Sequence, residues 1–303
     1  QTVYGRENGI PGGCANDIAQ TNDGILWIGT YGGLYRYNGT EFKWVDEYAS
    51  VKTVNCLYKD EEGRLWIGTN DGGVSIMIDE KIINVVSEKE GLSADSVKCI
   101  TQGSDGDYYI GTTGAMSVVS LAGGLTVKSY IDDIKYAVSA DSDKNGNIAV
   151  VSDNGQLSIV KNAAVISEYS ASDGGRYTTC SFDDAGMLYV GTSKGNIDKY
   201  EYDLYNNAYV LKESVSCNEL NNIKEIYFVD NTLTENGTLF VCADNGTGYY
   251  DSQNQFINID TGSFNNSIDH MTADYQGNLW FTSSRLGLLR LSRSAFTQLN
   301  YEH

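Results

Sequence analysis

The stretch DGILWIGTYGGLYRY at residues 23–37 is the first of seven related segments in the 303-residue chain. The other six are EGRLWIGTNDGGVSI (62–76), DGDYYIGTTGAMSVV (105–119), NGNIAVVSDNGQLSI (145–159), AGMLYVGTSKGNIDK (185–199), NGTLFVCADNGTGYY (236–250) and QGNLWFTSSRLGLLR (276–290). Every segment has a glycine at its second position: Gly24, Gly63, Gly106, Gly146, Gly186, Gly237 and Gly277. Successive glycines are about 42 residues apart on average, which is typical of a repeat of four β-strands.

A large and a small residue share one face of the strand that follows each glycine. The residue three positions after the glycine is aromatic in all segments but one: Trp27, Trp66, Tyr109, Ala149, Tyr189, Phe240 and Trp280. Two positions later stands a mostly small residue: Gly29, Gly68, Gly111, Val151, Gly191, Cys242 and Thr282. Because side chains alternate between the two faces of a strand, both positions lie on the same face. The pattern favours packing between neighbouring sheets over an aromatic platform for sugars.

The repeat predicts an all-β fold, a seven-bladed β-propeller with four antiparallel strands per blade, as one domain over residues 1–303. In the second unit we expect strands at residues 54–59, 65–69, 74–78 and 82–87. A single blade exposes its strand edges and faces, and a closed ring of seven removes that exposure. Closure requires a terminal segment to complete the last blade. Residues 2–5 and 295–301 both resemble an outer strand, so the sequence leaves both open.

The composition argues against several classes of partner. Acidic residues outnumber basic ones by 40 to 21, for a net charge of −19, which repels phosphate backbones and anionic membranes. We therefore expect no nucleic-acid partner, and neutral or cationic small molecules remain open. The chain has no apolar run of membrane-spanning length and no signal-peptide pattern, so no direct membrane insertion is expected. The six cysteines lack metal-type spacing, and we expect small buried residues rather than disulfides.

Two units and two connectors carry a family resemblance. The units NDGILWIGTYGGLYRYNGTEF (22–42) and DEEGRLWIGTNDGGV (60–74) resemble the two-component regulator propeller repeat. The segments NGIPGGCANDI (8–18) and EGLSADSVKCI (90–100) resemble the blade connector of that family. The likeness extends over nearly the whole chain and is strongest in the first, second and seventh units.

The resemblance implies an architecture and a location. Such propellers form the extracytoplasmic sensory region, periplasmic or on the outer face of the membrane, of bacterial hybrid histidine kinases and diguanylate cyclases. It implies that this propeller is the first of two, with the second propeller and a β-sandwich of the same receptor as partners. It leaves a homodimer open, and it implies that the output domain lies outside this sequence.

Loops at one end of the ring are the expected ligand-binding surface. Loops between the second and third strands of a blade, and connectors between blades, share one face of a propeller, and binding residues concentrate on such loops. Side chains there could hydrogen-bond a glycan or stack on its rings. The candidates are Tyr31, Asn55, Asp71, Tyr136, Asp153, Arg176, Lys194, Asn222, Asn245, His270 and Arg285. In the repeat alignment, His270 falls on an inner strand at the position of Asp17, Cys56, Cys99 and Thr179, which favours a packed or channel-facing residue over a catalytic one.

No metal, cofactor or catalytic group is predicted. Asp141, Asp143 and Asn145 precede Gly146 in the order that opens a calcium loop, but Ser152 stands where a closing glutamate belongs. The hairpin turn shared by all units explains these residues better, so they are only a weak calcium candidate. His270 and His303 are the only histidines, and no Ser-His-Asp spacing is present.

The sequence therefore favours a non-catalytic sensory propeller that binds a small ligand, for instance an oligosaccharide. One alternative is a propeller hydrolase or lyase that acts on a polysaccharide. A pocket with two carboxylates, or His270 beside a carboxylate and a cation, would favour that alternative. A second alternative is a structural spacer that mediates dimerisation.

Overall fold

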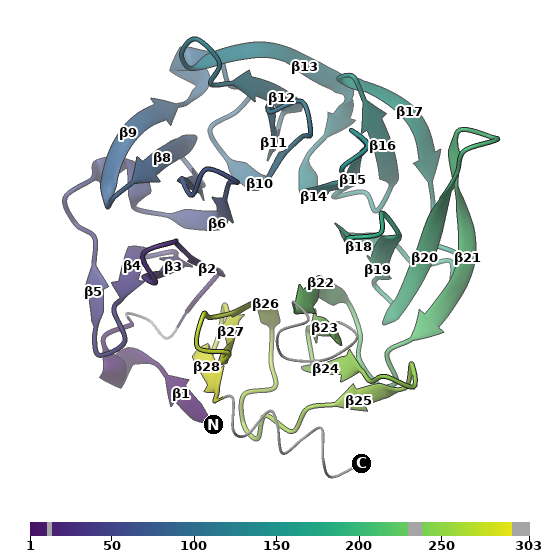
Figure 1. The fold of residues 1–303 in the computed structure, drawn as a ribbon. Helices are drawn as coiled ribbons and strands as arrows, with labels where there is room; N and C mark the ends of the chain where they lie inside the picture. Colours follow the sequence, from purple (N-terminus) through teal and green to yellow (C-terminus); the bar gives the residue numbers. More distant parts are fainter. Residues whose placement is uncertain (11–13, 230–237, 293–303) are drawn as a thin grey trace.

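The computed structural model describes residues 1–10, 14–229 and 238–292, which form a ring of seven four-stranded antiparallel sheets (Figure 1). Blade I contains β2 (Asp17–Gln20), β3 (Leu26–Thr30), β4 (Gly33–Tyr37) and β5 (Phe42–Trp44). Blade II contains β6 (Val54–Lys59), β7 (Leu65–Thr69), β8 (Val74–Ile78) and β9 (Lys81–Val86). Blade III contains β10 (Val97–Gln102), β11 (Tyr108–Thr112), β12 (Ala115–Ser120) and β13 (Thr126–Lys135). Blade IV contains β14 (Ala137–Ser142), β15 (Ile148–Ser152), β16 (Leu157–Lys161) and β17 (Ala164–Tyr169).

The remaining blades follow the same order around the ring. Blade V contains β18 (Tyr177–Phe182), β19 (Leu188–Thr192), β20 (Asn196–Asp203) and β21 (Ala208–Ser216). Blade VI contains β22 (Ile223–Val229), β23 (Thr238–Ala243), β24 (Gly246–Tyr250) and β25 (Phe256–Asn258). Blade VII contains β26 (Ile268–Ala273), β27 (Leu279–Ser283), β28 (Gly287–Leu291) and β1 (Thr2–Tyr4). The helices of the described residues are short 3₁₀ turns: η1 (Arg6–Asn8), η3 (Ala49–Val51) and η4 (Glu88–Glu90).

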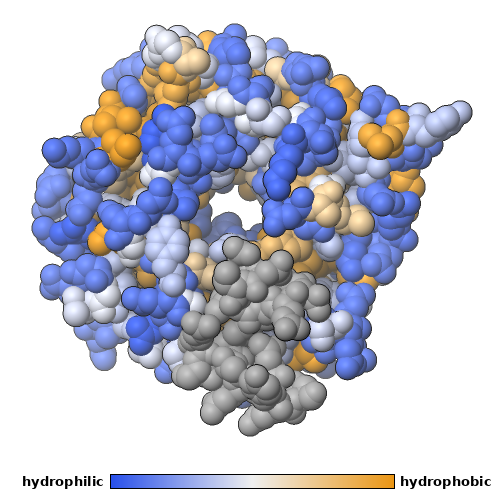
Figure 2. Space-filling view, in the orientation of Figure 1, coloured by the Kyte–Doolittle hydropathy of each residue, from blue (hydrophilic) through white to orange (hydrophobic). Residues whose placement is uncertain are grey.

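The predicted fold class is confirmed. In blade II the expected inner strand and the two strands after it match β6, β7 and β8, while β9 begins and ends one residue before the expected 82–87. Figure 2 shows that the face in view is mainly hydrophilic and has an opening at its centre. Among the residues that the structure describes, no helix is both long enough and apolar enough to span a bilayer.

The N-terminal strand closes the ring. β1 pairs antiparallel with β28, with Val3 opposite Leu289, and becomes the outer strand of blade VII. The Tyr4 ring stacks on Trp280 at 5.5 Å between ring centroids. Of the two segments that the sequence left open, residues 2–5 therefore supply the outer strand of blade VII, and the other candidate, residues 295–301, lies outside the described residues.

The repeated glycines adopt one backbone conformation. The φ angles of Gly24, Gly63, Gly106, Gly146, Gly186 and Gly277 all lie between 80° and 85°. This is the left-handed region, which costs glycine little and other residues more. Gly237, the seventh predicted turn glycine, lies outside the described residues.

An aspartate three residues before the glycine links several of these turns to the core. The Asp60 carboxylate accepts hydrogen bonds from the backbone N–H of Arg64 (2.8 Å) and from the indole N–H of Trp66 (2.9 Å). Asp274 makes the equivalent bonds with Asn278 (2.8 Å) and Trp280 (2.8 Å). The acidic turn is thus a structural device that also satisfies a buried indole donor.

The large and small residues of the repeat pack between blades, as predicted. Trp27, Trp66 and Trp280 are at most 2 % exposed. A Cβ atom added to Gly68 would lie 2.5 Å from Cys56 Sγ and 2.7 Å from Val97 Cγ1 of the next blade. Glycine at this position therefore lets the inner strand of the next blade approach closely.

Five of the six cysteines are buried thiols, while Cys14 is only half-buried, so the expectation of burial is wrong for Cys14. Cys56, Cys99, Cys180, Cys217 and Cys242 are all buried and form no disulfide. Burial raises the pKa of each thiol, for example that of Cys99 to about 12. They are unreactive packing residues at neutral pH, as the sequence predicted.

Candidate ligand-binding site

Hydrogen bonds place the two expected sets of loops side by side at one end of the ring. The backbone N–H of Asn70, between β7 and β8, donates to the carbonyl of Thr53, just before β6 (2.9 Å). In blade IV the N–H of Asp153 donates to the carbonyl of Tyr136 (2.9 Å), and in blade V the N–H of Ser193 donates to that of Arg176 (2.8 Å). The loops between second and third strands therefore share one face with the connectors that lead into the inner strands.

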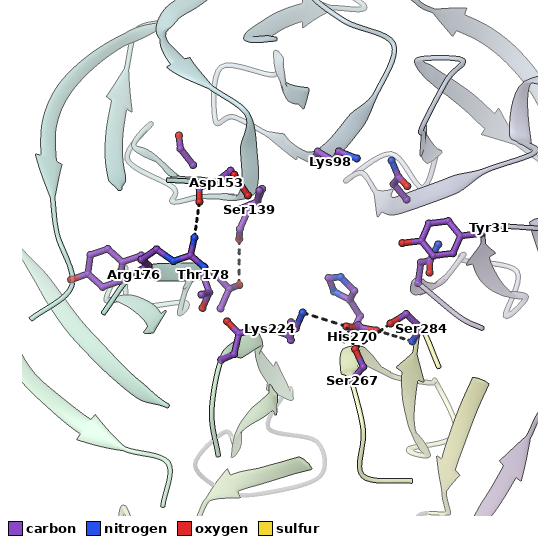
Figure 3. A pocket seen from close by; sticks show the side chains of 18 residues that line it. Tyr31, Lys98, Ser139, Asp153, Arg176, Thr178, Lys224, Ser267, His270 and Ser284 are labelled. Atoms are coloured by element: carbon purple, nitrogen blue, oxygen red, sulfur yellow. Dashed lines mark hydrogen bonds and ion pairs between the residues drawn. The ribbon is translucent and has the colours of Figure 1, made fainter. Parts of the chain in front are cut away.

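A cavity of about 460 Å³ lies at this end of the central channel (Figure 3). Its volume is within the range of about 300–1,000 Å³ that is typical of small-molecule sites. Six predicted residues line it: Tyr31, Asn55, Asp153, Arg176, Asn222 and His270. The other lining residues are Asn16, Lys98, Val138, Ser139, Ser152, Tyr177, Thr178, Thr179, Lys224, Ser267, Asp269 and Ser284.

Five predicted residues do not line this cavity: Asp71, Tyr136, Lys194, Asn245 and Arg285. The ring centroid of Tyr136 is 6.0 Å from the ammonium of Lys98, which does line the cavity. Lys194 donates to the carbonyl of Asp173 (2.8 Å), and Asn245 accepts from the N–H of Asn221 (2.9 Å). Asp71 and Arg285 are exposed in their turns. The side chains of Lys194 and Asn245 therefore bond within the loops and not in the cavity.

The lining is built on one repeat position, at which the sequence prediction named Asn55 without recognising that the position recurs in every blade. One residue on the inner strand of each blade, or directly before it in blade I, reaches the cavity: Asn16, Asn55, Lys98, Val138, Thr178, Lys224 and Asp269. Several of these side chains also join neighbouring blades. Asn16 donates to the carbonyl of Val54 (2.8 Å), and Asn55 donates to that of Val97 (2.9 Å). The repeat alignment itself contains this signal, because the seven residues immediately precede the position shared by Asp17 and His270.

The next position along the inner strands contains three charged residues, Asp17, Glu225 and His270, which form a cluster. It contains Asp17, Cys56, Cys99, Ser139, Thr179, Glu225 and His270. The predicted alignment of His270 with Asp17, Cys56, Cys99 and Thr179 is confirmed, and Glu225 is an addition. His270 Nδ1 lies 3.3 Å from Glu225 Oε1 and 4.0 Å from Asp17 Oδ1.

The carboxylates of this cluster determine the charge of the histidine. Burial disfavours the imidazolium, but Asp17 and Glu225 outweigh that effect and raise the pKa of His270 to about 10. Burial also raises the pKa of Asp17, and His270 opposes that rise. Glu225 Oε2 accepts the backbone N–H of Met271 (2.5 Å), and Asp17 Oδ2 accepts that of Leu57 (2.7 Å). At neutral pH, His270 is therefore a cation held by two anchored carboxylates.

The weak calcium candidate has its oxygens engaged within the protein. Asp141 accepts the backbone N–H of Phe182 in the next blade (2.7 Å). Asp143 accepts the N–H of Asn145 (2.9 Å) and of Asn147 (2.8 Å). Within residues 1–10, 14–229 and 238–292, no group of three or more His, Cys, Asp or Glu side chains is arranged to hold a metal ion. These contacts favour the interpretation of this motif as a hairpin turn.

Two segments of the chain, residues 9–32 and 49–71, match the family model described as the two component regulator propeller. These two segments are similar to the two component regulator propeller repeat. The matched segments include Tyr31 and Asn55, which line the cavity. No curated protein matches the sequence.

Solved structures share the fold of these repeats at low sequence identity. The extracellular domain of the hybrid two component system BT3049 from B. thetaiotaomicron superposes with a TM-score of 0.80 at 18% identity, over 100% of this chain and 42% of that one. The extracellular domain of BT4673 from the same organism superposes with a TM-score of 0.65 at 17% identity, over 95% of this chain and 38% of that one. A streptogramin B lyase superposes with a TM-score of 0.71 at 14% identity, over 93% of this chain and 94% of that one. This chain therefore spans less than half the length of either extracellular domain.

Proposed function

We propose that this chain is a non-catalytic sensory propeller of a bacterial two-component receptor and that it binds a saccharide in the central cavity. The observation that carries the proposal is the cavity itself, to which every blade contributes an equivalent inner-strand residue. The repeats matched at residues 9–32 and 49–71 support the sensory role. A site assembled from all blades is also suited to reporting occupancy to the whole ring.

The chemistry of the lining suits a sugar. Asn, Ser and Thr side chains supply both hydrogen-bond donors and acceptors, which matches the hydroxyls of a saccharide. Tyr31 is 60% exposed at the rim, so its ring is available to stack on a pyranose face. Polar groups on a rigid scaffold are the usual source of orientation and specificity in small-molecule sites.

The histidine cluster supports binding over catalysis. His270 stands beside carboxylates and near Lys224, which is the arrangement that would favour a lyase or hydrolase. However, a histidine whose pKa is about 10 holds its proton at neutral pH and is a poor general base. Asp17 and Glu225 each accept a backbone N–H, so they act as anchors. The second candidate function is a propeller lyase, which the fold likeness to streptogramin B lyase supports.

We further infer the setting of the propeller. It would be the first of two consecutive propellers in an extracytoplasmic receptor region, with the second propeller and a β-sandwich as intramolecular partners. The share of the BT3049 and BT4673 domains that it covers, 42% and 38%, supports a larger receptor. Dimerisation through this propeller is a separate proposal that sedimentation of the purified chain tests.

Calorimetric titration with a panel of oligosaccharides tests the proposed function. Binding is expected, and a saccharide at about 100 times its Kd should stabilise the fold by about 2.7 kcal/mol. Chromatography of the same mixtures should show the saccharides unchanged. Cleavage products would establish the lyase or hydrolase alternative, and an absence of binding across the panel would favour the structural spacer.

A further inference from the structure

We infer that the cavity selects saccharides that carry an anionic group, such as a uronate carboxylate or a sulfate ester. This inference rests on the proposed function, because it specifies the ligand class of the same site. It also departs from the expectation that the overall charge suggests, namely a neutral or cationic ligand.

Among the side chains that line the cavity, cations outnumber carboxylates, whereas the reverse holds for the whole chain. The protein has a net charge of −19, yet its cavity is lined by the cations Lys98, Arg176, Lys224 and His270. The carboxylates among the lining residues are Asp153 and Asp269. The contrast matters because interactions between exposed charges fade within about 10 Å at ordinary salt, so a bound ligand responds mainly to the lining.

Two of the four cations already have carboxylate partners. Lys224 Nζ lies 3.2 Å from Asp244 Oδ1 and 3.8 Å from Asp269 Oδ1. His270 is held by Asp17 and Glu225. These four carboxylates outnumber the two cations, so this part of the cavity contributes no net positive charge.

Lys98 and Arg176 differ from Lys224 and His270 in the groups that surround them. Within the described part of the chain, neither lies within ion-pair distance of a carboxylate. The Lys98 ammonium contacts neutral groups, namely Asn70 Oδ1 at 3.4 Å and the Tyr136 ring. Arg176 Nη1 donates to the backbone carbonyl of Asp153 at 3.4 Å. A guanidinium has five N–H donors, so this bond leaves others for a ligand.

The placement of these two cations suits a sugar that bears one anionic group. Lys98 lies on β10 of blade III, and Arg176 lies just before β18 of blade V, with blade IV between them (Figure 3). Ser139 of blade IV lines the cavity between them, and its hydroxyl accepts the backbone N–H of Cys180 (3.2 Å). Carboxylate or sulfate oxygens bound by Arg176 or Lys98 form charge-assisted hydrogen bonds, which are stronger than neutral ones.

Calorimetry with matched ligand pairs tests the inference. The pairs are α-1,4-linked galacturonate trimer with α-1,4-galactotriose, glucuronate-containing with glucose-containing trisaccharides, and sulfated with unsulfated galactose disaccharide. We expect one anionic member to bind at least about tenfold more tightly than its neutral partner. The Kd of that anionic member should increase when the salt concentration is raised from about 20 to about 300 mM, because salt screens the attraction between the charges.

Substitutions of opposite sign separate charge from folding. Arg176→Gln and Lys98→Gln should each weaken anion binding about fivefold to twentyfold, whereas Asp153→Asn should strengthen it. Lys52→Gln is the matched control, since Lys52 is exposed on the connector into β6 and does not line the cavity. It should leave the affinity unchanged.

Each outcome is decisive. If neutral members bind as tightly as anionic ones, the inference on ligand class is overturned while the proposed function stands. If no member of any pair binds, the proposed function fails and the inference fails with it. If Arg176→Gln and Lys52→Gln weaken binding equally, the effect arises from general charge and not from this cavity.

Discussion

Gly68→Ala should destabilise the propeller because the inner strand of blade III leaves no room for a methyl group. The added Cβ atom would lie 2.5 Å from Cys56 Sγ and 2.7 Å from Val97 Cγ1. Both neighbours are buried, and Val97 has no exposed surface, so neither can move into solvent. Overpacking of this kind typically costs about 1–3 kcal/mol.

Thermal unfolding by circular dichroism measures this effect. For a chain of this size, about 1–3 kcal/mol corresponds to a fall in Tm of about 2–5 °C. Gly5→Ala is the matched control, because its added Cβ would meet nothing within 4 Å and its φ of −141° suits alanine. That variant should unfold within about 1 °C of the parent protein. A Gly68→Ala protein as stable as the Gly5→Ala protein would refute the account of close packing between blades.

Three further predictions concern closure and charge. Deletion of residues 1–5 removes β1 and exposes the edge of β28, so Tm should fall and association should increase in light scattering; unchanged behaviour would contradict closure by β1. His270→Gln should lower Tm most below about pH 6.5, and the deficit should shrink as pH rises towards 10, because a pKa raised by folding stabilises the protonated form; a deficit constant across this range would argue against the Asp17–His270–Glu225 cluster. Asp60→Asn should cost about 1–3 kcal/mol at neutral pH and less below about pH 4 in urea unfolding, because hydrogen bonds from Arg64, Trp66 and Tyr108 outweigh burial and lower the pKa of Asp60. The stability that this ionised carboxylate provides is lost as pH falls through its folded pKa, and a pH-independent difference would contradict that role.

The fold was predictable because the same local sequence pattern recurs in seven segments of the chain. A glycine before an aromatic strand fixed the left-handed turn, and the described turn glycines all have φ near 80°. Ring closure was not predictable in the same way. Residues 2–5 and 295–301 have similar patterns, and the choice of β1 as the outer strand of blade VII depends on tertiary contacts such as the stacking of Tyr4 on Trp280.

The site was predictable only in part, since loop composition does not show which side chains face the channel axis. Lys194 and Asn245 have suitable chemistry, but they bond to neighbouring loop backbone. Asn16 and Lys98 are less conspicuous in sequence, and the geometry of the inner strand brings them to the cavity. Glu225 was missed because the longer spacing of the sixth unit obscures its alignment with His270.

The charge of the cavity could not be read from composition. A net charge of −19 predicts repulsion of anions at long range. Lys98 and Arg176 line the same cavity only because blades III and V are placed close together in the ring. Residues about 80 positions apart in the chain have no local signal that joins them.

A crystal structure of the propeller with its tightest-binding saccharide tests the central claim most directly. The account predicts the sugar in the channel cavity, with its anionic group on Arg176 or Lys98 and a ring against Tyr31. A saccharide bound on the outer strands or on the opposite end of the ring, with the cavity unoccupied, would contradict it.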